Sequence, residues 1–154
     1  MKKAIYFIVP LFFIACESDK EKFERAAREC SQKNSIENLE LSFYGYSTMD
    51  ANSVSIKIQR GGKIIKDYKD TIPKKFTDSL RLRRDYTIKQ NILLNDTLLV
   101  KIADEPTKKL YGFSYAVQAH FSMMDRNYGC TFSSFTENGK IMKDYRVVFT
   151  KKTE

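Results

Sequence analysis

The sequence predicts an all-β domain, an antiparallel β-sandwich or partly closed barrel of about seven to eight strands, preceded by a short helix. Three observations lead to this prediction. Apolar residues recur with a period of two from residue 36 onward, and turn residues separate the apolar runs at regular intervals. The chain is also 42% hydrophobic and 13% aromatic, so it has enough apolar side chains to build a core.

The first 15 residues have the order of a secretory signal. Lys2 and Lys3 precede an apolar run from Ala4 to Ala15. This run is shorter than the roughly 20 residues that a membrane-spanning helix needs. We therefore expect residues 1–15 to be a signal peptide. Removing them leaves 139 residues with 25 basic against 19 acidic groups, a formal charge of +6, because two of the 27 Lys and Arg lie in the signal.

The end of this run carries a short motif. Phe13-Ile14-Ala15-Cys16 resembles the lipobox of bacterial lipoproteins, although the first position is usually leucine. The resemblance implies cleavage before Cys16 and lipid attachment to it, and two or three acyl chains hold a protein durably on a membrane. The alternatives are an ordinary cleaved signal or an uncleaved anchor. The polar residues from Glu17 onward contain no stop-transfer pattern, which favours the lipoprotein.

Taken with the charged start at Glu17-Ser18-Asp19-Lys20-Glu21 and a small Lys-, Ile-, Asn- and Tyr-rich β domain, the lipobox resembles the small outer-membrane lipoproteins of Bacteroidetes-type bacteria. The resemblance implies a lipid-anchored protein of the cell envelope, on the outer membrane. It leaves open whether the domain faces the periplasm or the exterior. It does not extend to the β domain, which we match to no family.

Residues 16–35 are expected to form a lipidated tether with a short helix. Ser18 and Glu21 have the spacing of a capping box. Phe23, Ala26, Ala27 and Cys30 then fall on one face of a helix over residues 18–30. A flexible charged tether is the competing interpretation, since so short a helix is marginal unless it packs on something.

Residues 36–154 are expected to be the sandwich domain. Its first strands are indicated by alternating apolar residues in 39–43, 54–58, 64–72, 88–94 and 98–102. Gly61-Gly62 and Asn95-Asp96 supply turns between them, and no simple register places every apolar residue of 54–72 on one face, which predicts a β-bulge.

The longest predicted strand runs from Tyr111 to Met123. Its odd-numbered residues are mostly aromatic or aliphatic and its even-numbered residues are mostly small or polar. Such alternation predicts one face on a core, including Tyr111, and one face toward solvent, including His120.

The C-terminal part of the chain predicts a hairpin around Asn138-Gly139, a sequence that favours a two-residue turn. The register that follows contains four pairs: Glu137 with Lys140, Phe135 with Met142, Phe132 with Tyr145, and Cys130 with Val147. In this register Cys130, Phe132, Tyr145 and Val147 share one face, which is expected to be buried.

Cys30 and Cys130 remain as an even pair if Cys16 is lipidated. Disulfides are typical of exported proteins, so these two residues are the candidate bridge. Closing a loop of about 100 residues stabilises a fold by about 4–5 kcal/mol in the chain-entropy model. Two buried free thiols are the alternative, because sequence alone does not place the two Cα atoms within bridging distance.

No residue is assigned to catalysis, to a metal or to a cofactor. His120 is the only histidine and no nucleophile motif accompanies it. The cysteines and histidine lack zinc spacing. A nucleic acid partner is also not expected, because the aromatic residues fall on predicted core faces of an exported protein.

Leu80-Arg81-Leu82-Arg83-Arg84 predicts a strand with leucines on one face and the side chains of Arg81 and Arg83 on the other. The two arginines could form an anion-binding stripe for lipid or polysaccharide phosphate. The simpler interpretation is an amphipathic strand whose charged face discourages edge pairing.

The preferred function is a non-enzymatic binding or accessory domain that contacts a protein or glycan at the membrane surface. A narrower version is an inhibitor or immunity lipoprotein, whose basic charge would suit an acidic target. The alternative class is a hydrolase with two facing carboxylates, which would need a cleft and shifted titration.

Overall fold

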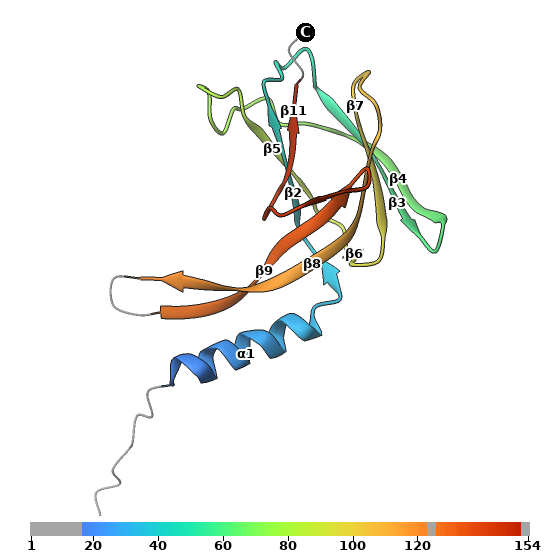
Figure 1. Ribbon diagram of the computed structural model, residues 1–154. Coiled ribbons are helices and arrows are strands. Elements are labelled where there is room, and N and C mark those ends of the chain that lie inside the picture. The colour runs from blue at the N-terminus through green and yellow to red at the C-terminus, as the bar shows by residue number, and fades with distance from the viewer. Residues whose placement is uncertain (1–16, 123–125, 152–154) are drawn as a thin grey trace, which may run out of the picture.

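The computed structural model describes residues 17–122 and 126–151, so the expected signal peptide and Cys16 lie outside the described residues, as does Met123. The described chain is mostly β, with one helix. Two facing sheets form an open sandwich, and a long hairpin leaves it with the helix lying along one side (Figure 1). The all-β prediction is confirmed, and the described strands do not close into a barrel.

The helix α1 spans Asp19–Gln32, two residues beyond the predicted end. Its capping box is present as predicted: the backbone N–H of Glu21 donates to Ser18 Oγ at 3.3 Å, and the Glu21 carboxylate accepts from the backbone N–H of Ser18 at 2.7 Å. The strand β1 (Ser35–Ile36) follows and pairs with β6 (Ile92–Leu93). The helical interpretation of this segment is therefore confirmed.

The larger sheet has six strands, and each neighbouring pair is antiparallel. In spatial order they are β10 (Lys140–Met142), β9 (Arg126–Glu137), β8 (Lys108–Phe121), β7 (Thr97–Ile102), β3 (Ser53–Arg60) and β4 (Lys63–Thr71). The turn at Gly61-Gly62 joins β3 to β4 as predicted, and their register shifts between Ile58 and Gln59, which is the predicted irregularity.

The smaller sheet has three strands: β11 (Val147–Thr150), β2 (Leu39–Tyr44) and β5 (Arg84–Ile88). β2 and β5 are antiparallel, but β11 runs parallel to β2. The prediction of a wholly antiparallel fold is wrong at this pair. Parallel neighbours need a crossover connection, and here the larger sheet lies between β2 and β11 in the chain.

The core lies between the two sheets. Leu41 and Phe43 of β2 are fully buried, as are Ile56 of β3 and Val100 of β7. The Phe43 ring stacks on that of Phe149 with centroids 5.4 Å apart. The alternation predicted for β3 and β7 is therefore confirmed by burial on one face of each strand, and the apolar residues of β2 are buried as predicted, although Ser42 on its other face is buried as well.

Eleven strands are described, more than predicted, because several are only two or three residues long. The single strand expected over residues 88–94 is instead divided. β5 begins four residues earlier, at Arg84, and ends at Ile88, while β6 covers Ile92–Leu93 in a separate pairing with β1.

The predicted C-terminal hairpin holds only near its turn. Glu137 pairs with Lys140, and Phe135 pairs with Met142, as expected from Asn138-Gly139. These two pairs are confirmed.

The outer half of that register is wrong. β10 ends at Met142, and Val147 pairs with Leu41 rather than with Cys130. Val147 is fully buried against β2, whereas Tyr145, expected opposite Phe132, is 64% exposed. Burying the β11 side chains in the sandwich stabilises the fold more than extending a short edge strand would.

The outer parts of β8 and β9, residues 114–121 and 126–134, extend beyond the sandwich and are called the arm below (Figure 1). At its base Gly112 has a φ of +63°, and the register of the two strands shifts between Tyr111 and Ser114. Because of this bulge Leu110 and Phe113, three residues apart, are both buried. Tyr111, predicted on the core face, is half-buried instead.

Candidate functional site

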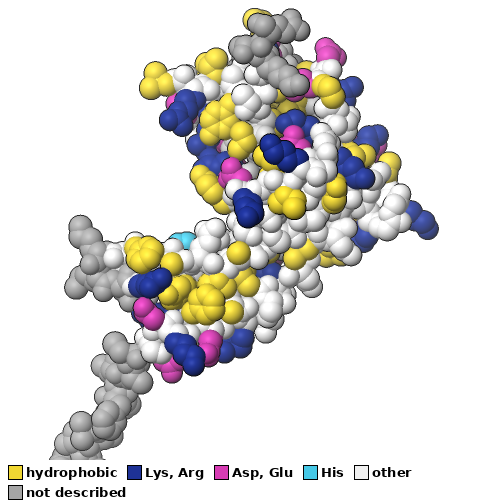
Figure 2. Space-filling view, in the orientation of Figure 1, with side chains coloured by type: hydrophobic (Ala, Val, Ile, Leu, Met, Phe, Trp, Pro, Cys, Tyr) yellow, Lys and Arg dark blue, Asp and Glu magenta, His cyan; other side chains and the backbone are white. Residues whose placement is uncertain are grey.

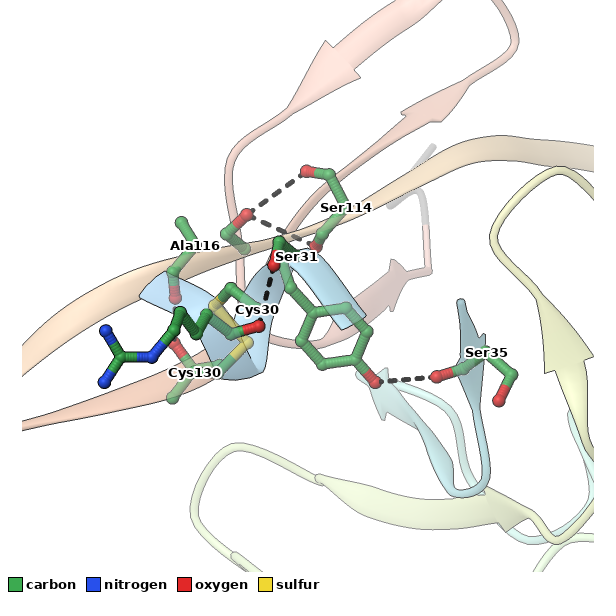
Figure 3. Close-up of a disulfide and its surroundings, with 10 residues drawn as sticks. Cys30, Ser31, Ser35, Ser114, Ala116 and Cys130 are labelled. Atoms are coloured by element: carbon green, nitrogen blue, oxygen red, sulfur yellow. Dashed lines mark hydrogen bonds between the residues drawn. A yellow bond between two sulfur atoms is a disulfide. The ribbon is translucent and has the colours of Figure 1, made fainter. Parts of the chain in front are cut away.

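One face of the arm is covered by α1. Val117 lies opposite Cys130, and Ala119 lies opposite Tyr128. Cys130 forms a disulfide with Cys30 in the last turn of α1, with Cα atoms 5.2 Å apart (Figure 3). The predicted disulfide is confirmed. The expectation that Cys130 points into the sandwich core is wrong, because its side chain joins the arm to the helix.

The opposite face of the arm is polar. Gln118 pairs with Gly129, and His120 with Asn127. His120 is exposed, as predicted from the alternation. A Cβ on Gly129 would lie 3.0 Å from His120 Nε2, so the imidazole lies against a position that has no side chain.

A groove of about 590 Å³ runs between the polar face of the arm and the loop of residues 143–146. Figure 2 shows the surface hollowed between the arm and the rest of the molecule. The groove is the candidate functional site, and these residues line it: Ala116, Gln118, Ser133, Ser134, Lys143, Asp144 and Tyr145.

Three serine hydroxyls meet at the inner end of the groove, where the strand register shifts beside Ser114. Ser114 Oγ lies 3.2 Å from Ser133 Oγ and 2.7 Å from Ser134 Oγ. Ser133 Oγ also donates to the Ser114 carbonyl at 3.3 Å. Each hydroxyl is bonded to hydroxyl or carbonyl oxygen rather than to a base. The cluster can exchange hydrogen bonds with a ligand but lacks the activated nucleophile of a hydrolase.

The rim of the groove carries an exposed aromatic ring in a fixed position. The Arg146 guanidinium lies 4.3 Å from the centroid of the Tyr145 ring and donates to its hydroxyl. Arg146 is itself held, because its backbone N–H donates to Asp144 Oδ1 at 3.2 Å and its Nη1 lies 3.7 Å from Glu40 Oε1. Most of the surface of the Tyr145 ring stays open to solvent at the rim of the groove.

The two arginines of the predicted anion stripe do not share a strand face. The strand expected over residues 80–84 is wrong, because the backbone N–H groups of Leu80 and Arg81 donate to Asp78 Oδ1 and close a turn. Leu82 then has a φ of +47°. Arg81 lies in this loop, with Nε 3.8 Å from Asp78 Oδ2.

Arg83 is part of an ion-pair network beside the groove. Its guanidinium donates to both carboxylate oxygens of Asp85, at 2.9 and 2.7 Å, and lies 3.7 Å from Glu40 Oε1. Burial by itself would raise the pKa of Asp85, but hydrogen bonds from Arg83 and Ser42 outweigh burial and keep that pKa low. Glu40 thus connects Arg83 to Arg146, and Arg83 supports the rim of the groove indirectly.

Arg84, the last residue of the stretch 80–84, is fully buried. Its Nη2 donates to the carbonyls of Ser47 at 2.7 Å and Ala51 at 2.6 Å, and burial lowers its pKa. Arg84 therefore holds the loop between β2 and β3 through its Nη2.

A second groove, of about 410 Å³, is lined by two carboxylates, Asp70 and Asp85. The Tyr86 hydroxyl donates to Asp70 at 2.8 Å and lowers the pKa of that carboxyl, and the pKa of Asp85 is also low. A glycosidase pair needs one acid whose pKa is raised so that it holds a proton. This pair lacks that asymmetry.

In the part of the chain that the structure describes, no cluster of three or more His, Cys, Asp or Glu residues could hold a metal ion. No helix within residues 17–122 and 126–151 is both long and apolar enough to cross a membrane. No protein-family model, curated protein or solved structure matches this chain.

Proposed function

We propose that this protein is a lipid-anchored, non-enzymatic binding domain of the bacterial cell envelope, which holds a glycan or a protein segment in the groove between the arm and the loop of residues 143–146. The lipobox resemblance at Cys16 supports the proposed location in the cell envelope. The Cys30–Cys130 disulfide also supports it, since such bonds persist in oxidising compartments outside the cytoplasm.

The groove is the observation that carries the proposal. Its volume lies within the range of small-ligand sites, about 300–1,000 Å³. Its lining combines the Tyr145 ring with the serine hydroxyls, the Gln118 amide and the charges of Lys143 and Asp144. Sugars present apolar C–H faces to aromatic rings and hydroxyls to such polar groups, so this lining favours a glycan. A protein ligand, as in an inhibitor or immunity lipoprotein, is the narrower alternative.

The experiment is photocrosslinking in intact cells with a photoreactive amino acid at position 145. We expect a discrete adduct, because a ligand in the groove must pass beside the exposed ring. The matched control carries the same amino acid at position 80, since Leu80 is 97% exposed and lies in the loop between β4 and β5. An adduct whose added mass is removed by glycosidase digestion identifies a glycan, and an adduct that contains peptides of a second protein identifies a protein.

The proposal is wrong if positions 145 and 80 give the same adducts. A carboxylate-dependent hydrolase would be favoured instead if purified protein cleaved envelope glycans and Asp70→Asn abolished the cleavage, because Asp70 lies in the second groove rather than beside Tyr145.

A further inference from the structure

The outer end of the arm carries a connected aromatic and basic patch. Phe121 is 74% exposed and Phe23 is 47% exposed. The Arg126 guanidinium lies 5.3 Å from the ring centroids of both Phe121 and Tyr128. The Tyr128 ring meets the Phe23 ring edge-on, with centroids 5.5 Å apart. These four residues, from α1, β8 and β9, are called the tip patch.

The tip patch lies at the end of α1 where the preceding chain enters. Lys22 Nζ donates to the Arg126 carbonyl at 3.2 Å, so the first turns of α1 rest on the start of β9. Five residues of helix separate Ser18 from Phe23, a rise of about 7 Å. Cys16 is two residues before Ser18, at most about 7 Å further. A lipid on Cys16 would therefore be attached roughly 15 Å or less along the chain direction from Phe23, one of the tip-patch residues.

We infer that the tip patch is a second membrane contact, in which Phe121 and its neighbouring rings enter the bilayer interface beside the lipid anchor. This inference rests on the proposed lipid attachment at Cys16. Aromatic rings with a polar or cationic edge prefer the boundary between headgroups and acyl chains. In Figure 2, hydrophobic side chains lie over the arm and α1, with basic and acidic side chains among them.

The contact depends on the aromatic rings rather than on charge. Glu17, Asp19 and Glu21 stand among Lys20 and Lys22 at the start of α1, so this end of the molecule has no strong excess of either sign. The protein is therefore expected to bind an anionic membrane only slightly more strongly than a neutral one. The same depth of insertion is expected on phosphatidylcholine alone and on phosphatidylcholine mixed with phosphatidylglycerol.

The absence of tryptophan in the chain makes the contact measurable. Phe121→Trp introduces a single fluorophore at an exposed position that folding does not require to be buried. The lipidated protein is reconstituted into vesicles whose acyl chains carry bromine near the headgroup. We expect a blue-shifted emission and about twofold quenching, because a ring in the interface lies within reach of the bromines.

The matched control is Leu80→Trp, which is at least as exposed but lies in the loop between β4 and β5, away from α1 and the arm (Figure 1). Its emission should stay that of a hydrated indole, without quenching. A Phe121→Trp signal equal to that of Leu80→Trp would overturn the inference.

Flotation of the same samples separates the two proposals. If the Phe121→Trp protein floats with the vesicles but its indole is unquenched, the tip contact is contradicted and the lipid anchor stands. Protein that carries no lipid and does not float contradicts both. Quenching on phosphatidylglycerol vesicles only would also contradict the inference, because it would indicate a contact governed by charge.

Discussion

Asp96 is a fully buried carboxylate whose charge is balanced within the fold. It accepts hydrogen bonds from Nε and Nη2 of Arg60, both at 2.8 Å, and from the backbone N–H of Leu93, also at 2.8 Å. The bonds from Arg60 hold the pKa of Asp96 below its ordinary value. The pair ties the end of β3 to the turn between β6 and β7.

Asp96→Asn tests this contribution. A carboxyl whose folded pKa is lowered stabilises the fold above its unfolded pKa of about 3.9, and this stability is lost as the pH falls through the folded pKa. We expect the variant to lose roughly 1.5–3 kcal/mol at neutral pH, the range for hydrogen bonds to charged groups.

Urea unfolding between pH 6 and pH 2 measures this effect. The difference in unfolding free energy between wild type and variant should shrink below about pH 4, as Asp96 takes up its proton. A difference that stays constant down to pH 2 would contradict the assignment.

Burial of individual charges was the part of the molecule least accessible from the sequence. Asn95-Asp96 was correctly interpreted as a turn, since local side-chain chemistry favours it there. Nothing local indicates that Asp96 meets Arg60, or that Arg84 reaches the carbonyls of Ser47 and Ala51. These partners lie more than 30 residues away in the chain, and only the folded backbone brings them together.

At the scale of elements, α1 is stabilised by its cover of the arm. Ala26 is its fully buried residue, and the disulfide holds its last turn against β9. Phe23 packs edge-on against Tyr128 near the other end of the helix. A helix of this length is marginal without such packing.

Cys30→Ser tests whether the disulfide holds α1 to the arm. In the chain-entropy model we expect a loss of about 4–5 kcal/mol, because the bridge closes a loop of about 100 residues. Hydrogen exchange should rise most in α1 and the arm, while β2, β3 and β7 should lose no more protection than the fall in the global unfolding free energy. Reduction of the wild type should reproduce the variant, and uniform loss of protection in α1 and the sandwich strands would contradict a local clamp.

Elements with a simple local pattern were predictable, and those decided by partners were not. The capping box predicted α1, and the alternation of apolar and polar residues predicted β2, β3, β7 and the long β8. The predicted register of the outer C-terminal hairpin is wrong, because Val147 can bury its side chain either beside β2 or across from β9. The local sequence pattern is the same in both cases. In the candidate site, the predicted polar face including His120 is correct, but the loop that completes the groove was assigned to a strand.

At the scale of the whole molecule, the proposed anchor decides where the groove operates. Fatty-acid labelling of the full chain in cells tests it. We expect labelled wild type in the membrane fraction, and unlabelled Cys16→Ala that no longer fractionates with the outer membrane. Ala15→Ser is the matched control, because it changes the neighbouring position to another small residue and keeps the cysteine. Labelling that persists in Cys16→Ala would contradict the anchor.

If the chain is exported as proposed, the parallel pairing of β11 with β2 also sets an order of events during export. Leu41 stands near the start of the described chain and its partner Val147 near the end. Until β11 has emerged during the proposed export, β2 therefore lacks one neighbour and Phe43 lacks the ring of Phe149. Contacts so distant in sequence form slowly, and unpaired strand edges invite aggregation. This domain would remain dependent on the translocation and chaperone machinery until its final strand has emerged.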